Sequence, residues 1–322
     1  MSAVIARFDG KVQAPFANSE SIMLRLILSL ILVFPLFAGC SSPASDGTAG
    51  QESKANSGAK FDRWTAADDP HLFSENLETK LDALPLEGQA LNIPWAASYW
   101  PVFEDSINFR WEGEGTLSPS EKYGEAFGIE DLADKVSEHH GIDSMRSAKE
   151  CTTEDDCSEP GDGTCAKRVG EETGRCIPTW WGICHAWAPA SIMEPEARFP
   201  VTKNGVTFKV NDIKALVTLT YNRSTSKFVS LRCNKTDEQD EIEYDGYSRP
   251  SSDDAECKDT NPGTYHLLLA NYLGLKGQSF VEDRTFDSEV WNQPLRSYKV
   301  NALEEVDAKS ANRLVGVLAQ GE

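Results

Sequence analysis

Basic residues are scarce in this chain of 322 residues. Its 31 Lys and Arg are outnumbered by 51 Asp and Glu, and the formal net charge is −20. Because binding to a phosphate backbone needs a basic patch, this balance argues against a nucleic acid as a partner. Such a charge suits a soluble, secreted protein whose surface repels other copies of itself.

The apolar run near the N-terminus is too short for a membrane span. It extends from Leu26 to Phe37, whereas a spanning helix needs roughly 20 apolar residues. With Arg25 before it and small residues after it, the run is typical of a secretory signal. An uncleaved anchor, or a plain signal cut elsewhere, is the alternative interpretation.

The end of that run resembles a bacterial lipobox. The sequence LFAGC, which ends at Cys40, predicts cleavage before this residue and lipid attachment to its sulfur. We therefore expect export and a lipid anchor in a bacterial cell envelope, with the outer membrane favoured because Ser41 follows. The predicted order is an upstream extension at 1–22, a lipoprotein signal peptide at 23–39, a flexible tether at 40–61 and one catalytic domain at 62–322.

The cysteines lack the close C-x-x-C pairs of zinc sites, so we expect no metal there. The four cysteines from Cys151 to Cys176 predict a small disulfide-stapled insertion, because an exported protein enters an oxidising compartment where thiols pair. Three connectivities are open. Cys233 and Cys257 most simply close an acidic loop. With Cys40 lipidated, Cys184 is left without a partner. The eight cysteines stand at positions 40, 151, 157, 165, 176, 184, 233 and 257.

An unpaired thiol in such a protein is a candidate nucleophile. The sequence around Cys184 predicts a helix from Ile183 to Ser191 that Pro189 kinks or shortens. A thiol in the first turn faces the positive end of the helix dipole, which favours the thiolate. The backbone N–H groups of Ile183 and Cys184 can hold an oxyanion. A buried structural cysteine among core tryptophans is the alternative.

Histidines are few, which narrows the search for a base to five residues. His185 follows Cys184 directly, and neighbours on a helix point about 100° apart, so it would not easily reach the thiol. The pair Asn261-Pro262 is a helix-start signal. His266 is therefore expected near the start of a rigid helix, which Gly274 can end.

An acid that orients this base is expected downstream. The run QSFVED predicts a strand that ends at Asp283, so this carboxylate would also lie on a rigid element, as a triad requires. Asp287 is a second candidate for the acid, and spacing does not decide between them. A core histidine and a surface aspartate are the simpler interpretation of the same residues.

Several stretches resemble the elicitor-type transglutaminase family, that is, the oomycete transglutaminase elicitors and their bacterial lipoprotein relatives. Carried over by position, the resemblance implies Cys184 as nucleophile, His266 as base and Asp283 as acid. The run VWNQPLRSYK is similar to the surface segment of oomycete members that plants detect as an elicitor. The lipobox and the insertion depart from that pattern. The similar stretches are residues 93–111, 118–128, 180–190, 204–221, 261–266 and 283–300.

The resemblance implies protein-glutamine γ-glutamyltransferase activity. The thiolate would attack a glutamine carboxamide, and a lysine or other primary amine would take the acyl group from the thioester. Partners are then glutamine- and lysine-bearing proteins, and the membrane through the lipid. Trp100, Trp180 and Trp181 would line a substrate groove or an ordinary core. A cysteine peptidase or glutamine deamidase with the same triad, and a non-catalytic envelope-binding lipoprotein, stay open.

The pattern of elements predicts an α+β fold without assuring a standard papain-like core. Ser118, followed by Glu121, predicts a helix start, and Asn211 or Asp212 is expected to cap another helix with an apolar face. Short strands are expected at GVTFKV, KFVSLRC and QSFVED. The acidic loop at 237–246 would bind Ca²⁺ or be a solvated surface; we expect no other cofactor.

Overall fold

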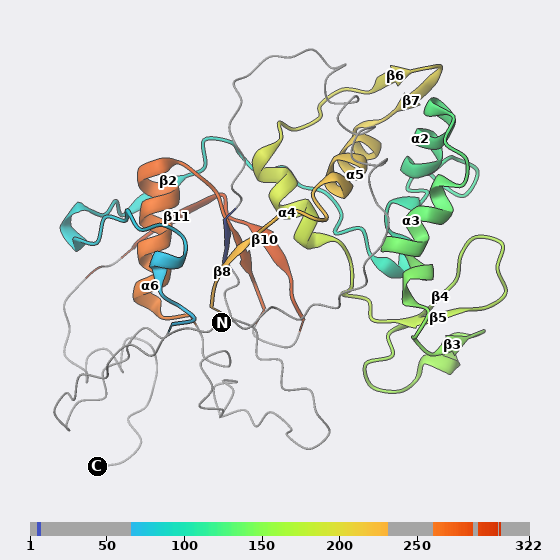
Figure 1. The fold of residues 1–322 in the computed structure, drawn as a ribbon, viewed down its shortest axis with the longest axis horizontal. Coiled ribbons are helices and arrows are strands. Elements are labelled where there is room, and N and C mark those ends of the chain that lie inside the picture. Colours follow the sequence, from blue (N-terminus) through green and yellow to red (C-terminus); the bar gives the residue numbers. More distant parts are fainter. Residues whose placement is uncertain (1–4, 8–65, 231–259, 286–288, 302, 304–322) are drawn as a thin grey trace.

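The computed structural model describes residues 5–7, 66–230, 260–285, 289–301 and 303 (Figure 1). Its mixture of helices and short strands confirms the α+β class. The signal segment, the tether, Cys40, the pair Cys233 and Cys257, the loop at 237–246 and Asp287 lie outside the described residues. None of the helices in the described ranges is both long and apolar enough to cross a membrane.

The described residues form five α-helices and eleven short strands. The α-helices are α2 (Pro119–Phe127), α3 (Leu132–His140), α4 (Cys184–Met193), α5 (Val210–Thr220) and α6 (Pro262–Leu268), which a π-helical stretch (Leu269–Lys276) continues. The strands are β1 (Ile5–Arg7), β2 (Glu87–Gln89), β3 (Glu150–Cys151), β4 (Thr164–Ala166), β5 (Gly174–Ile177), β6 (Val201–Lys203), β7 (Val206–Phe208), β8 (Lys227–Val229), β9 (Val281–Asp283), β10 (Asn292–Pro294) and β11 (Ser297–Lys299).

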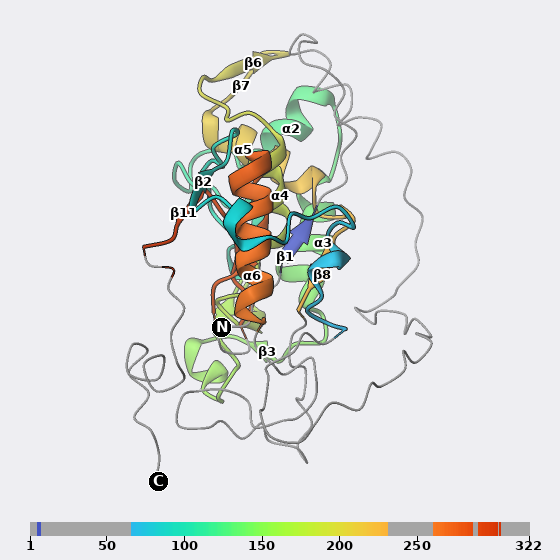
Figure 2. The ribbon, with the colours of Figure 1, turned by 90° about the vertical axis from the view of Figure 1, so that its left-hand side faces the viewer.

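A four-stranded antiparallel sheet, in the order β10-β9-β1-β8, stands between α4 and α6 (Figures 1 and 2). Successive side chains of a strand point to opposite faces. Accordingly Val281 packs against Ala188 of α4, whereas the flanking Phe280 packs against Leu268 at the end of α6. The two helices therefore cover opposite faces of the sheet. Residues 5–7, from the predicted upstream extension, form β1 between β9 and β8.

The main core lies among α2, α3, α4 and α5. It includes Tyr123, Phe208 and Ile183, all almost fully buried. Ser118 caps α2 as predicted, because its hydroxyl accepts from the N–H of Glu121 while that carboxylate accepts from the N–H of Ser118. The predicted strands at 205–210, 227–233 and 278–283 appear as β7, β8 and β9.

Three helix ends differ from expectation. The cap of α5 is Lys209, because Asp212 lies one turn inside and accepts the N–H of Lys209 at 2.7 Å. The helix after His266 passes Gly274 and ends at Gly277, whose φ of 60° suits a glycine. Pro189 does not end α4, which continues to Met193. Because Pro189 has no backbone N–H, only the carbonyl of residue 185 loses its helical hydrogen bond. Residue 185 is exposed, so water can satisfy that carbonyl.

The predicted insertion is confirmed, and its connectivity is Cys151–Cys165 and Cys157–Cys176. The two bonds staple a three-stranded sheet in the order β3-β5-β4. Four sulfurs gather in one cluster, so the insertion has a cystine core. Its Ala166 and Ile177 also pack against Val102 and Ile142 of the rest of the domain.

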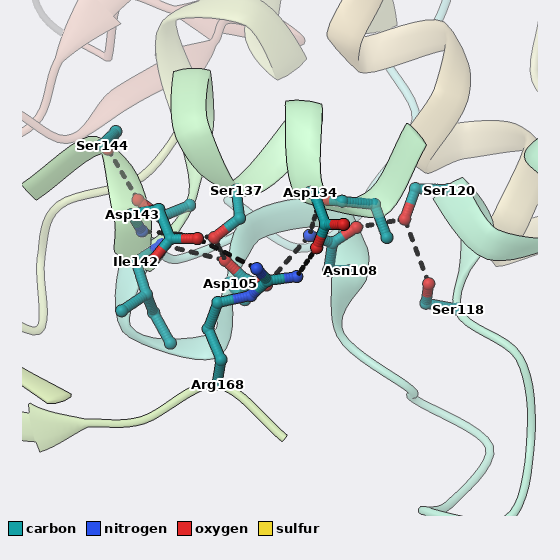
Figure 3. Close-up of polar contacts among 12 residues, drawn as sticks. Asp105, Asn108, Ser118, Ser120, Asp134, Ser137, Ile142, Asp143, Ser144 and Arg168 are labelled. Carbon is teal, nitrogen blue, oxygen red and sulfur yellow. Dashed lines mark hydrogen bonds and ion pairs between the residues drawn. The ribbon is translucent and has the colours of Figure 1, made fainter. Parts of the chain in front are cut away.

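Arg168 anchors this insertion to the rest of the domain (Figure 3). Its guanidinium lies 2.7 Å from Asp134, 2.9 Å from Asp143 and 3.5 Å from Asp105. Asp105 is the most enclosed of the three and also accepts the backbone N–H of Ile142 at 2.9 Å. Because its carboxylates come from different elements, the cluster ties the insertion to α3, to the 3-10 helix that follows α3 (Ile142–Met145) and to the turn at Asp105.

Candidate active site

Cys184 occupies the first position of α4, with Ile183 as the residue before the helix. Among the described cysteines it alone is unpaired, and it is 5% exposed. Its side chain packs with Trp95, Trp187 and Ala190. The N-terminus of a helix carries unpaired N–H groups and a partial positive charge, so the sulfur lies where backbone donors are available.

A short extended segment holds the turn before α4. Pro101 and Gly182 form an isolated antiparallel bridge, and a Cβ on Gly182 would stand 2.6 Å from the carbonyl oxygen of Tyr99, so only glycine fits. The N–H of Ile183 donates to that same carbonyl at 2.8 Å. This N–H is therefore already engaged, which leaves Cys184 as the backbone donor of the predicted pair for an oxyanion.

The sulfur of Cys184 contacts the start of β10. Its Sγ donates to the carbonyl oxygen of Val290 at 3.6 Å and accepts from Nδ2 of Asn292 at 3.5 Å. Asn292 is paired in register with Asp283 on β9. Asp283 Oδ1 accepts the N–H of Trp291 at 2.9 Å. The structure thus brings Asp283 to the segment that touches the thiol.

His266 lies elsewhere. It belongs to α6, which covers the face of the sheet opposite to α4, and its Nε2 is buried without a hydrogen-bond partner among the described residues. None of the histidines in the described ranges hydrogen-bonds to Sγ of Cys184. The structure consequently does not join the expected nucleophile to the expected base. Catalytic hydrogen bonds are often loose without substrate, so this arrangement by itself assigns no base.

His185 faces away from the thiol, as its helical position predicts. Its Nε2 contacts Oδ1 of Asn222 at 2.8 Å, and Nδ2 of Asn222 lies 3.3 Å from Nδ1 of His140. Burial, with the nearby charges of His139 as a second cause, lowers the pKa of His140 to about 4. A neutral His140 ring can accept from the amide, so this chain joins the ends of α3, α5 and α4.

The predicted groove tryptophans occupy different settings. Trp100 is a core residue, 4% exposed, and its Nε1 has no partner among the described residues. Trp181 packs against Ile177 of the insertion, with the ring of Trp180 edge-on at 5.9 Å. The aromatic ring at the segment that touches Cys184 is instead Trp291.

Two site residues were missed by sequence reasoning, namely Trp291 and Asn292. The Trp291 ring meets Tyr99 edge-on at 5.1 Å, and its Nε1 donates to Glu289 at 2.8 Å. Burial first, then the charges of Glu104, Cys184 and Glu289, raise the pKa of Tyr99. The available signal was their place in VWNQPLRSYK, which suggested only host recognition and not chemistry.

The described residues show one group of close potential metal ligands, Cys151, Cys157 and Cys165. All three sulfurs are in disulfides and therefore cannot act as thiolate ligands.

Comparison with known proteins places the chain in a family. The sequence model described as "Transglutaminase elicitor" matches residues 68–316, and the chain belongs to this family. Its structure is similar to the crystal structure of the GP42 transglutaminase from Phytophthora sojae, with 39% sequence identity and a TM-score of 0.63. The similarity covers 77% of this chain and 65% of the other, slightly under two thirds. No curated protein matches the sequence.

Proposed function

We propose that this protein is a protein-glutamine γ-glutamyltransferase with Cys184 as its nucleophile. The observation that carries the proposal is the unpaired thiol at the N-terminus of α4 in a chain of the transglutaminase elicitor family. The related GP42 protein is named a transglutaminase. This similarity supports the reaction class and leaves the substrate of this chain to experiment.

The reaction requires two acyl transfers. The Cys184 thiolate attacks the carboxamide carbon of a glutamine, the N–H of Cys184 supports the oxyanion, and the amide nitrogen leaves as ammonia after taking a proton from the general acid. A lysine ε-amine, having lost a proton to the general base, then attacks the thioester and displaces the thiolate. The products are an isopeptide and the original thiol.

His266 as general base and then general acid, with Asp283 as the carboxylate that orients it, forms part of this proposal on the strength of the family resemblance. Asp283 supports it by its position on the same segment as Val290 and Asn292. The place of His266 on α6 favours a second candidate, a non-catalytic envelope protein, because acyl transfer from an amide also needs an acid that protonates the leaving ammonia. The two candidates differ in whether thiol-dependent acyl transfer occurs at all.

The test is incorporation of a fluorescent primary amine into casein by the full-length chain, purified with its disulfides intact. Cys184→Ala, His266→Gln and Asp283→Asn are compared with His71→Gln, a substitution on an exposed ring far along the sequence. Labelling by wild type and His71→Gln but not by Cys184→Ala supports the transferase. Ammonia release without labelling would indicate a glutamine deamidase. Full labelling by His266→Gln would remove that histidine from the mechanism while keeping the transferase.

The proposal includes a lipid anchor at Cys40, in the outer membrane. A clickable fatty acid supplied to bacteria that express the full chain should label wild type and not Cys40→Ser, and fractionation should find the label in the outer membrane. Labelling that survives the substitution contradicts the anchor at this position. Amine incorporation with and without EDTA tests Ca²⁺ dependence in the same preparations, and we expect no loss.

A further inference from the structure

Two groups of the protein act on the sulfur of Cys184 in opposite ways. The carbonyl oxygen of Val290, 3.6 Å away, can only accept, so it stabilises the protonated thiol. Nδ2 of Asn292, 3.5 Å away, can only donate, so it stabilises the thiolate. The reactive form of a cysteine is the thiolate. Of the two contacts, the one from Asn292 therefore promotes reaction.

The amide of Asn292 is held by the sheet. Asn292 is the first residue of β10 and lies opposite Asp283 of β9. The N–H of the preceding Trp291 donates to Asp283 Oδ1 at 2.9 Å, and Thr285 Oγ1 donates to the same oxygen at 3.1 Å. These bonds fix the backbone from which the amide projects towards α4. A donor placed in advance on a rigid strand stabilises charge without reorganisation.

We propose that Asn292 is a catalytic residue that stabilises the Cys184 thiolate, and that Asp283 is a positioning residue that holds Asn292 in place. The inference rests on the proposed function, since it concerns the same nucleophile. Asn292 neither gives nor takes a proton. It holds the anion until the bond between sulfur and the acyl carbon forms, and it again faces an anion when the thioester is resolved.

The test measures the thiolate directly. The full-length chain is treated with iodoacetamide between pH 4 and 10, and alkylation of the peptide that contains Cys184 is followed by mass spectrometry; sulfur displaces iodide, so the rate reports the thiolate fraction. Asn292→Ala loses the donor and should raise the midpoint of the curve of alkylation rate against pH by about one pH unit. Below that midpoint, alkylation should be about tenfold slower than in wild type. Asn292→Asp adds a negative charge and should move the midpoint further.

The matched control is Gln293→Glu. It makes the same change from amide to carboxylate one residue along β10, where the side chain points to the other face of the sheet. We expect its midpoint to stay within about 0.3 pH units of wild type, because the added charge is on the far side of the backbone. In an Asp283→Ala background, which lacks the acceptor for the N–H of Trp291, Asn292→Ala should shift the midpoint less than it does in wild type, because the amide is no longer held in place.

An unchanged midpoint in both Asn292 variants, or an equal shift in Gln293→Glu, overturns the inference. Far-ultraviolet circular dichroism identifies variants that fail to fold, and Asn292→Ala keeps the test decisive if Asn292→Asp is lost. Alkylation does not need turnover. A wild type that never labels casein, with the expected midpoint shifts, would refute the transferase alone; labelling with unchanged midpoints would refute the role of Asn292 alone.

Discussion

Replacing Arg168 by Met should destabilise the domain and make its stability depend on pH. The substitution keeps an unbranched side chain of similar stem and removes the charge that faces Asp105 (Figure 3). Burial already raises the pKa of Asp105, and hydrogen bonds from Ser137, Asn108 and Ile142 together with the charge of Arg168 oppose that rise. Without Arg168, the carboxylate of Asp105 keeps its burial and loses its only cationic partner among the described residues.

The magnitude follows from the burial of the pair. Removing one partner of a fully buried ion pair costs about 3–5 kcal/mol. The side chains of Arg168 and Asp105 are 26% and 13% exposed, so water screens part of the loss, and we expect about 2 kcal/mol at pH 7.5. The more exposed Asp134 and Asp143 should add little, since surface ion pairs contribute about 0–1 kcal/mol.

The sign of the pH dependence is opposite to that of most acidic groups. The folded protein binds a proton at Asp105 more tightly than the unfolded chain does, whose carboxyl has a pKa of 3.8. Stability therefore falls as the pH rises through 3.8 towards the higher native value. Arg168→Met raises the pKa of Asp105 further and so enlarges this loss of stability. The cost of the substitution should therefore be full at neutral pH and should shrink as the pH approaches 4.

The assay is urea unfolding of the full chain at pH 7.5 and 4.5, with Arg146→Met as control. Arg146 pairs with Glu138 on the surface, at 72% and 48% exposure, and its loss should cost less than about 0.5 kcal/mol at either pH. Asp105→Asn should cost less in the Arg168→Met background than alone. The reasoning is refuted if Arg168→Met matches the control at pH 7.5, or if its cost is the same at both pH values.

Three further predictions concern stability. The pKa of His140 is about 4 in the native state against 6.5 for the free side chain, so the free energy of unfolding should fall by at most about 3 kcal/mol as the pH drops from 6.5 to 4. His140→Gln should flatten the dependence of the melting temperature on pH in this range, and an unaltered slope would contradict the prediction. Replacing Cys157 and Cys176 by Ser opens a loop of 19 residues and should lower the free energy of unfolding by about 3 kcal/mol. Proteolysis should then cut the insertion rapidly, and resistance to protease equal to that of wild type would argue against a cystine core. Ser118→Ala removes the cap of α2 and should lower the free energy of unfolding by about 1 kcal/mol, whereas Ser118→Asp should retain most of it.

Local signals in the sequence were sufficient for much of the fold. Ser118 and Asn261 cap α2 and α6 because their side chains reach N–H groups only two or three residues away. The cysteine spacing predicted a stapled insertion, and counting partners singled out Cys184. The family resemblance agrees with the match over residues 68–316. All of these depend on short-range chemistry or on composition.

The ends of the helices and the disulfide connectivity depended on packing. Gly274 does not end its helix. It lies where the backbone of Gly88 comes close, and the left-handed turn that ends the helix is at Gly277. The strand pairing of β4 and β5 selects one of the three possible disulfide connectivities. It places Cys165 opposite Cys176, and each of these two residues bonds to a different cysteine. Spacing along the chain contains neither fact.

Which side chains surround the thiol was decided by the tertiary structure alone. Asn292 is 108 residues from Cys184 and meets it because β10 lies beside α4. His266 and Asp283 are close in sequence, yet the helix of one and the strand of the other place them differently with respect to the thiol. The sequence by itself determined which thiol is left unpaired and the elements available to support it. The face of the sheet on which each element packs decided its neighbours, because that face depends on the burial of apolar side chains from the whole chain.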